Sequence, residues 1–245
     1  VWGELIKANI YQIERGAPSA TVVNYYDPDC AEVRIPLKAE LSPAMTAQRY
    51  FNDYRKLSTA YLLLGKLIDD SKAELAYLES VADELTRAES DRELAEIKAE
   101  LTSAGYLRAQ RGRQKAPKAL PPLHFVSDDG FDIYVGRNNR QNDELTLRTA
   151  AKSDIWLHTK SVHGTHTIID ARGEKVPPST VMQAAVLAAY HSKARQSGSV
   201  AVDFCPVKHV KKPGGARPGM VIYDNYETLY VTPDEALVKR LKADE

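Results

Sequence analysis

The most regular feature of this chain is a run of apolar positions that alternate at spacings of four and three residues. Its members are Tyr50, Tyr54, Leu57, Tyr61, Leu64, Ile68, Ser71, Leu75, Leu78, Ala82 and Leu85, of which Ser71 is polar. This spacing follows the 3.5-residue repeat of a coiled coil. Because Ser42-Pro43 is a typical helix start, the pattern predicts one long helix over residues 43–88.

A second helix is expected directly after the first. Ser90 followed by Glu93 matches a capping box, and apolar positions at helical spacing continue to Gly105. The two segments therefore predict an antiparallel helical hairpin. The helices would be about 69 Å and about 21 Å long, so the short one covers only part of the stripe. We expect a neighbouring domain or a second copy of the chain to cover the rest. Burial of an apolar side chain of this size contributes roughly 1.5–3 kcal/mol of stability, which is lost when the side chain stays in water.

The segment before this hairpin predicts a helix over residues 4–15 and a β-hairpin formed by residues 21–26 and 32–37. A lone β-hairpin is marginally stable in water. The chain begins without Met and in the middle of a pattern, so we interpret residues 1–42 as the remnant of an N-terminal portion.

Residues 123–245 alternate between strand and helix patterns. The predicted strands are 123–126, 132–135, 145–148, 155–158, 165–170, 199–204, 220–223 and 228–231, with the last two forming a hairpin around Asp224-Asn225. Helices are expected over 178–197 and 233–242. The predicted class is α+β: a long antiparallel coiled-coil hairpin over 43–104, a linker over 105–122, and a mixed α/β domain over 123–245 with a central sheet and one long packing helix.

Charge is unevenly distributed although the formal net charge is zero. Residues 105–245 hold 21 of the 33 basic residues and 15 of the 33 acidic ones, which indicates an anionic partner for this part. The linker 106–122 carries five cations, three prolines and no acid. It is interpreted either as a solvated tether or as a segment that grips phosphates.

Several classes of function lack their sequence signatures. The two cysteines form no paired motif and no run of 18 apolar residues occurs, so the chain predicts a reducing compartment, the cytoplasm, and no membrane insertion. Neither a nucleophile elbow nor a phosphate-binding loop is present. The histidines His158, His163 and His166 lack the spacing of a zinc site. We expect no enzyme, no metal and no cofactor.

Three segments carry side chains suited to RNA. One loop combines Arg137 and Arg140 with amides, and a glycine-rich loop supplies more cations. Alternation places Asp154, Trp156 and His158 on one strand face, either as a platform on which an unpaired base stacks or as an ordinary half-buried edge. The predicted RNA-binding residues are Arg137, Asn138, Asn139, Arg140, Asn142, Asp154, Trp156, His158, His166, Lys208, Lys211, Lys212 and Arg217.

The order of these motifs resembles a known family. The segments are Arg137-Asn-Asn-Arg-Gln-Asn142, Asp154-Ile-Trp-Leu-His158, Gly164-Thr-His166 and His209-Val-Lys-Lys-Pro-Gly-Gly-Ala-Arg-Pro-Gly219. They resemble the NFACT-R domain of the bacterial RqcH proteins, also called FbpA-type or PavA-type fibronectin-binding proteins, with NEMF as the eukaryotic relative. His163 stands before Gly164 where the family pattern has proline, which predicts a looser loop after the strand that carries Trp156.

The resemblance implies a role in ribosome quality control. Members of the family bind the large ribosomal subunit that holds a stalled peptidyl-tRNA and recruit alanyl-tRNA, so that the nascent chain gains a C-terminal alanine tail. This chain would supply the coiled-coil arm and the module that contacts rRNA and tRNA, with possible self-association through the arm. The alternative implied by the same family is an adhesin at the cell surface that binds fibronectin or fibrinogen.

Overall fold

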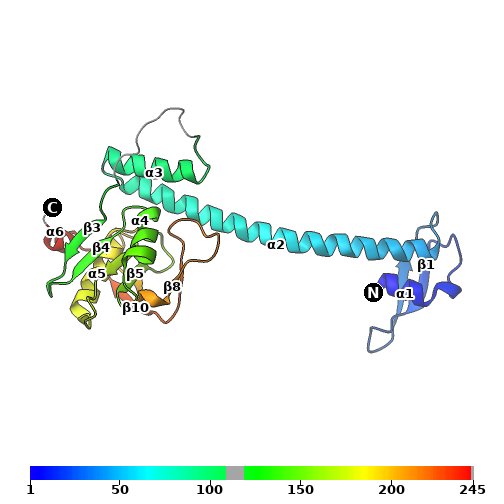
Figure 1. Cartoon of the computed structure of the whole chain (residues 1–245). Helices are drawn as coiled ribbons and strands as arrows, with labels where there is room; N and C mark the ends of the chain where they lie inside the picture. The colour runs from blue at the N-terminus through cyan, green and yellow to red at the C-terminus, as the bar shows by residue number, and fades with distance from the viewer. Residues whose placement is uncertain (109–118, 244–245) are drawn as a thin grey trace. The chain divides into compact units, whose positions relative to one another are not determined.

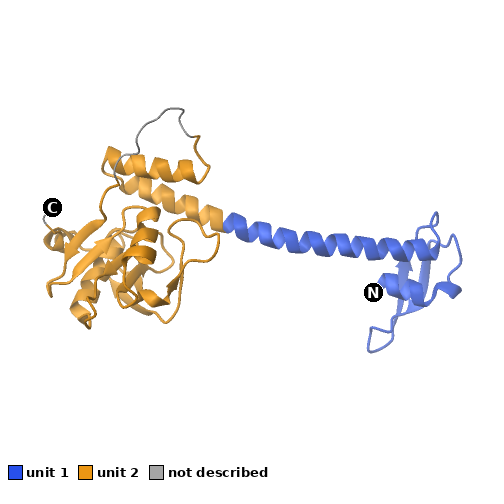
Figure 2. Ribbon diagram, in the orientation of Figure 1, with its two compact units in different colours: residues 1–72 blue, residues 73–245 orange. Residues whose placement is uncertain are grey.

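Residues 1–108 and 119–243 are described by the computed structural model shown in Figure 1. The chain divides into two compact units, Val1–Lys72 and Ala73–Glu245, and the boundary falls inside the longest helix (Figure 2). Residues 109–118 of the predicted basic linker lie outside the described residues, so both interpretations of that linker stay predictions.

The first unit contains a small antiparallel hairpin, as predicted. Its elements are α1 (Trp2–Ala8), the 3-10 turn η1 (Ile10–Gln12), β1 (Ser19–Val23), β2 (Glu32–Pro36) and the beginning of α2 (Pro43–Arg87). Leu5, Ile6 and Ile35 are fully buried where α1 and α2 cover the hairpin. The N-terminal helix is shorter than predicted because Asn9 ends it, with its side-chain amide donating to the Leu5 carbonyl at 2.9 Å.

The predicted helical hairpin is confirmed. Helix α2 ends at Arg87 and α3 (Asp91–Ser103) follows after a short turn. Ser90 forms the predicted capping box: its hydroxyl accepts a hydrogen bond from the Glu93 amide at 3.3 Å, and the Glu93 carboxylate accepts one from the Ser90 amide at 3.1 Å. The first orphan amides of α3 are therefore satisfied locally.

The buried face of α2 in the second unit is not the predicted one. Its buried side chains include Tyr77, Val81 and Glu84, and Ile97 of α3 packs with the first two. The Tyr77 hydroxyl donates to Glu100 at 2.8 Å, which helps to fix this packing. The predicted positions are instead exposed, as at Leu75, Leu78 and Leu85.

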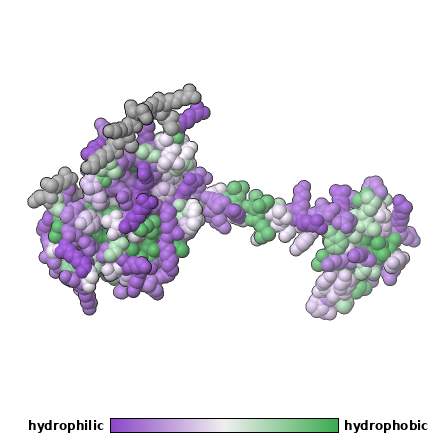
Figure 3. Space-filling model, viewed as in Figure 1, coloured by the Kyte–Doolittle hydropathy of each residue, from purple (hydrophilic) through white to green (hydrophobic). Residues whose placement is uncertain are grey.

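The apolar stripe on α2 within the first unit is also exposed. Tyr50 packs on the hairpin and donates to the Pro36 carbonyl at 2.7 Å, but the next stripe members, Tyr54, Leu57, Tyr61 and Leu64, are exposed. Hydrophobic surface is visible along α2 in Figure 3. Cover by a neighbouring domain or by a second copy stays a prediction. None of the helices in the described part of the chain is long and apolar enough to cross a bilayer.

The second unit is built on a six-stranded antiparallel sheet with the order β10-β7-β5-β6-β4-β3. The strands are β3 (Leu123–Val126), β4 (Asp132–Val135), β5 (Ile155–Thr159), β6 (Thr167–Ile169), β7 (Val200–Pro206) and β10 (Glu227–Val231). Helices α5 (Pro178–Tyr190) and α6 (Glu235–Leu241) pack on the face that carries Ile133, Leu157 and Val202. The α+β class and the long packing helix are confirmed, although α5 ends before the predicted residue 197.

A second layer covers the opposite face of the sheet. It consists of α4 (Asn139–Glu144), the π-helix η2 (Leu145–Thr149), the 3-10 turn η3 (Val207–His209) and the ribbon of β8 (Val210–Lys211) with β9 (Ile222–Tyr223). Leu145, Val207 and Val210 from this layer pack on Trp156 and Ile168. Two predictions are wrong here. Residues 145–148 are helical, and the hairpin around Asp224-Asn225 does not form because β9 pairs with β8 while β10 pairs with β7.

A buried carboxyl group lies where α2 packs inside the second unit. Glu84 is 3% exposed, and burial, followed by the nearby charge of Glu100, raises its pKa to about 9 from the ordinary value of 4.5. The folded state therefore favours the protonated form. The stability that this provides is fully present below the unfolded pKa and is lost as pH rises through about 9.

Replacing Glu84 by Gln should raise the stability of the second unit at pH 8, because the carboxyl is ionised in the unfolded chain and must take up a proton on folding, whereas the amide need not. We expect a gain on the order of 1–3 kcal/mol at pH 8 and a much smaller change at pH 5. Thermal unfolding followed by circular dichroism at both pH values measures it, with the exposed Glu89→Gln as control. Equal gains at the two pH values would contradict the raised pKa.

Gly219 allows the glycine-rich loop to approach α4 closely. Its φ is +76°, and a Cβ atom there would lie 2.2 Å from Asn139 Oδ1. Its amide donates to Asp143 Oδ1 at 3.1 Å. A side chain at this position would have to push the loop away from α4.

Gly219→Ala is expected to lower the free energy of unfolding by about 1–3 kcal/mol, through steric overlap and an unfavourable φ. Gly214→Ala, in the same loop, is the matched control because no atom lies within 4 Å of the added Cβ. Urea unfolding compares the two variants. If Gly214→Ala is as damaging as Gly219→Ala, the close approach to Asn139 is not the cause.

Candidate nucleic-acid interface

The two polar loops predicted to bind RNA lie side by side in the second unit. The Lys212 ammonium pairs with the Asp143 carboxylate, and the same carboxylate accepts the Gly219 amide at 3.1 Å. Asp143 belongs to α4, so one acidic side chain joins the loop 208–219 to the loop 137–142. The two loops therefore lie next to each other, while their contact with RNA stays a prediction.

The amides of the first loop are occupied within the protein. Asn138 caps α4 by accepting from the Gln141 amide at 3.0 Å and donates its own amide to Glu96 at 2.8 Å. Asn139 donates to the Ser80 hydroxyl at 2.9 Å, and Asn142 accepts from the His166 amide at 3.0 Å.

These three asparagines are between 2% and 5% exposed. Because buried amides must be hydrogen-bonded, they fasten the loop to α2, α3 and the sheet. The prediction that Asn138, Asn139 and Asn142 present free edges to sugars or bases is therefore corrected.

Four of the six predicted cations also have acidic partners. Arg137 donates to Glu93 at 2.6 Å and to the Pro121 carbonyl at 2.9 Å, so it joins the sheet domain to α3. Besides the Lys212 pair, the other ion pairs are Arg217 with Glu74 at 3.7 Å and Lys211 with Asp224 at 3.9 Å. The Lys211 pair is well exposed, so it leaves Lys211 free to meet a phosphate at little cost.

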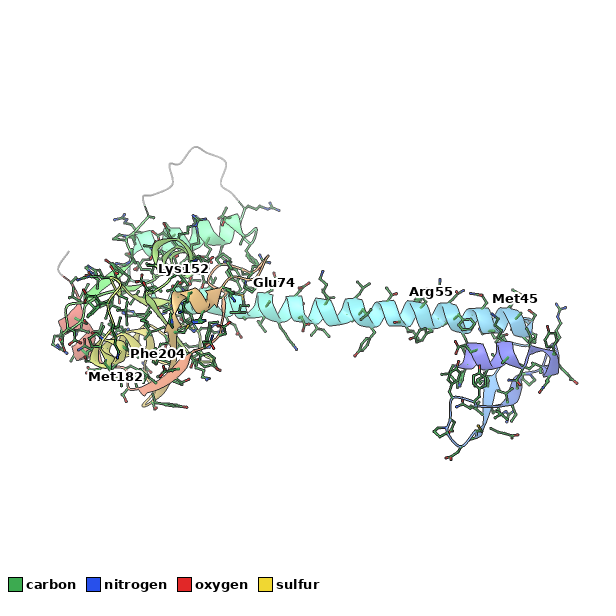
Figure 4. The ribbon with its side chains drawn as sticks, turned by 60° about the horizontal axis from the view of Figure 1, so that its bottom comes forward. Met45, Arg55, Glu74, Lys152, Met182 and Phe204 are labelled. Atoms are coloured by element: carbon green, nitrogen blue, oxygen red, sulfur yellow. The ribbon has the colours of Figure 1, made fainter. Side chains whose placement is uncertain are left out.

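Arg140 and Lys208 are exposed and form no ion pair with the side chains that the structure describes. The Lys208 amide donates to the carbonyl of Lys152 at 3.2 Å, which brings two lysines together (Lys152 is labelled in Figure 4). Lys152 and the nearby Arg148 are exposed, and neither is among the predicted RNA-binding residues. Their position in the sequence could have indicated a role, since both cations stand shortly before the strand that carries Trp156.

We name Arg148, Lys152, Lys208 and Lys211 the basic edge. Asp154 holds the turn that presents it: one carboxylate oxygen accepts from the Ala151 amide at 2.7 Å and the other from the Ala171 amide at 3.1 Å. Asp154 is only 5% exposed. Its role is to fix the backbone rather than to touch a ligand.

Trp156 lies in the core and not on an open platform. Its side chain is 0% exposed because the layer of η2 and β8–β9 covers that face of the sheet. The predicted exposed stacking surface is therefore wrong. Rings nevertheless gather around the indole, with centroids 4.7 Å away at Tyr223, 5.3 Å at His166 and 5.7 Å at His158.

The two histidines of this cluster are neutral at physiological pH. Burial lowers the pKa of His158 to about 4, and burial followed by the charge of His158 lowers that of His166 to about 3. His166 Nδ1 lies 2.8 Å from the Thr146 hydroxyl. Neutral imidazoles do not neutralise phosphate, so these residues offer ring faces and hydrogen-bonding groups instead.

A metal site is not formed by the described side chains, where no group of three or more histidine, cysteine or acidic residues comes together. The interface thus consists of exposed cations, internally satisfied amides and a neutral aromatic cluster. This combination suits a nucleic acid strand. The cations can bind its phosphates, and the rings can contact bases that are not paired.

Comparisons with known proteins agree with this chemistry. Residues 1–119 match the family model for the NFACT N-terminal and middle domains, and residues 122–225 match the model for the NFACT protein RNA binding domain. Several relatives are named Rqc2 homolog RqcH. The one from Bacillus subtilis is 42% identical over 99% of this chain and 42% of its own length, and the one from Streptococcus suis is 41% identical over 98% and 43%.

A solved structure shares the fold. It is the C-terminal part of the fibronectin/fibrinogen-binding protein from Streptococcus suis, at a TM-score of 0.77 and 42% identity, covering 83% of this chain and 81% of that one. This chain spans less than half the length of the RqcH relatives. Both the motif order and these matches lead to one conclusion: the chain belongs to the NFACT family.

Proposed function

We propose that this chain supplies the RNA-binding module and part of the arm of a ribosome quality control factor. The observation that carries the proposal is the basic edge, which stands on the domain that matches the NFACT RNA-binding model. The names of the RqcH relatives, and of a mouse relative named ribosome quality control complex subunit NEMF that is 31% identical over 74 residues, point to the same process.

In this proposal the phosphates of rRNA in the large subunit, and of tRNA, meet the exposed cations. These are the basic edge and Arg140. Arg137, Lys212 and the three asparagines act indirectly, since they hold the two loops at the sheet. Charge-dominated contact of this kind fixes position on an RNA without reading its sequence.

The proposed role includes no chemical step by this chain. Of the predicted site residues that could transfer protons, His158 and His166 have pKa values lowered by burial, which makes them weak bases, and Asp154 is used by backbone amides. Support for C-terminal alanine tailing would then come from placing RNA for a reaction that occurs elsewhere on the ribosome.

A second candidate function is binding of fibronectin or fibrinogen. The observation that favours it is the name of the Streptococcus suis protein whose structure shares this fold. The two candidates differ in what they predict about salt, because phosphate contacts weaken steeply as salt rises.

Reversing three charges of the basic edge tests the RNA proposal. We expect Arg148→Glu with Lys152→Glu and Lys208→Glu to weaken binding to tRNA and to 23S rRNA fragments at least tenfold, and to reduce the salt dependence by about three ion contacts. Fluorescence anisotropy titrations at 50 and 200 mM salt measure both effects.

The matched control reverses three exposed cations of α2, Arg55, Lys56 and Lys66, and so makes the same change in net charge. It should retain nearly all of the affinity. Equal losses in the two variants would show that only net charge matters, and unchanged binding by the first would remove the basic edge from the interface. Saturable binding to immobilised fibronectin at physiological salt, without competition by RNA, would favour the second candidate.

A further inference from the structure

A cavity of about 290 Å³ opens beside the aromatic cluster, inside the second unit. Helix α2 forms one wall through Ala76 and Ser80. The opposite wall contains Trp156, His158, His166 and Tyr223. The loops that end at Gly164 and Gly219 complete the lining, so the cavity lies directly beside the loop that carries Lys211 and Arg217.

The aromatic wall is arranged as a stack. The rings of Trp156 and His158 are nearly parallel, at an interplanar angle of 9° and a centroid distance of 5.7 Å. Tyr223 lies 4.7 Å from the indole centroid on another side. His158 and Tyr223 are the half-buried members of this group. A flat ring that enters the cavity therefore meets other rings, and bases stack favourably on aromatic side chains.

The lining combines apolar side chains with polar ones. It contains Ser80, Asn139, Ser161 and the imidazoles, but no lysine, arginine or carboxylate. The indole Nε1 of Trp156 is buried and has no hydrogen-bond partner among the described residues. A phosphate would lose its hydration here without meeting a cation. A neutral ring with donors and acceptors on its edge loses much less.

Charged groups stand close to the cavity but outside it. Arg217 lies two residues before Gly219, and its ion-pair partner Glu74 lies two residues before Ala76. The Arg217 guanidinium also lies 5.5 Å from the ring centroid of Tyr106 and 5.8 Å from that of Tyr77. A chain that places one neutral ring in the cavity would thus keep the phosphates on either side of it near cations.

We infer that this cavity receives one unpaired nucleobase of the bound RNA, stacked on the aromatic cluster while its phosphates remain at the cationic loops. The inference rests on the proposed RNA binding and adds to it a site for a base. It divides recognition into two parts. The basic edge binds the phosphates of any strand. The cavity adds affinity only when the strand has an unpaired base that can separate from its neighbours.

The test compares two single strands of equal charge. One is a 12-nucleotide oligo(A), and the other has the same backbone with every base replaced by an abasic spacer. Wild-type protein should bind oligo(A) about tenfold more tightly. Ala76→Phe places a ring in the cavity from α2 and should abolish this preference while leaving affinity for the abasic strand unchanged. Ala73→Phe adds the same ring to an exposed position of α2 outside the lining and should keep the preference.

The outcomes separate the two proposals. Equal affinity of wild-type protein for both strands, or a preference that survives in a folded Ala76→Phe, overturns the base site and leaves RNA binding standing. Absence of binding to either strand at low salt overturns both. Circular dichroism and thermal unfolding establish that each variant is folded.

A second measurement needs no variant of the cavity. The chain has two tryptophans, so Trp2→Phe leaves Trp156 as the sole indole reporter. Saturating oligo(A) should change the emission of Trp156, whereas saturating abasic strand should not. Identical emission with both strands would overturn the base site even if Ala76→Phe failed to fold.

Discussion

Burial of strand β5 on both faces is the constraint on which the second unit depends. Trp156 and Leu157 are neighbours in the strand and point to opposite faces, yet both are 0% exposed. Antiparallel sheets commonly leave one face exposed to water. In this sheet, both faces are buried at the central strand β5. Helix α5 covers one face, while the π-helix η2 and the β8–β9 ribbon cover the other. The second covering layer brings residues 137–142 and 208–219 together, although they are far apart in the chain.

Hydrogen-bond satisfaction then decides how the polar residues of those loops are used. Asn138, Asn139 and Asn142 are buried with the covering layer, and each has a partner in α2, α3, α4 or the sheet. Leaving a buried amide without a hydrogen bond costs about 1–3 kcal/mol. The loop is therefore more stable when all three amides have partners within the protein. The amides therefore fix the geometry of the interface. The side chains left for a ligand are the longer cations, whose charges reach solvent.

Sequence patterns predicted elements well where local signals decided the structure. The capping box at Ser90, the strands β3 and β4 and the start of α2 at Pro43 were all predicted correctly. Residues 145–148 were predicted as a strand because Leu145 and Leu147 alternate with polar positions. Their helical form continues directly from α4, whose N-cap at Asn138 was not recognised. A four-residue alternation is too short to outweigh a capped helix before it.

The buried face of α2 shows a different limit. The 4,3 pattern predicted a helix correctly but assigned its contact face to Leu75, Leu78 and Leu85, which are exposed, while Tyr77 and Val81 are buried. Periodicity identifies faces that are apolar, and it does not identify which partner packs on them. For the interface, residue types indicated the correct loops. They did not distinguish a cation paired internally, such as Arg137, from an exposed one, such as Lys152, because that depends on acids far away in sequence.

Internal pairing also explains how a chain with no net charge presents a surface for a polyanion. Arg137 and Lys212 are partnered by Glu93 and Asp143, so their charges stabilise the arrangement of loops and add little field outside. At physiological salt, charges interact over about 8 Å, so the field at the basic edge depends on which cations are paired locally more than on the net charge of the chain. The cavity beside it has neutral histidines because burial opposes protonation. In the proposed interface, phosphates bind the exposed cations and one base enters the cavity, whose described lining holds no lysine, arginine or carboxylate.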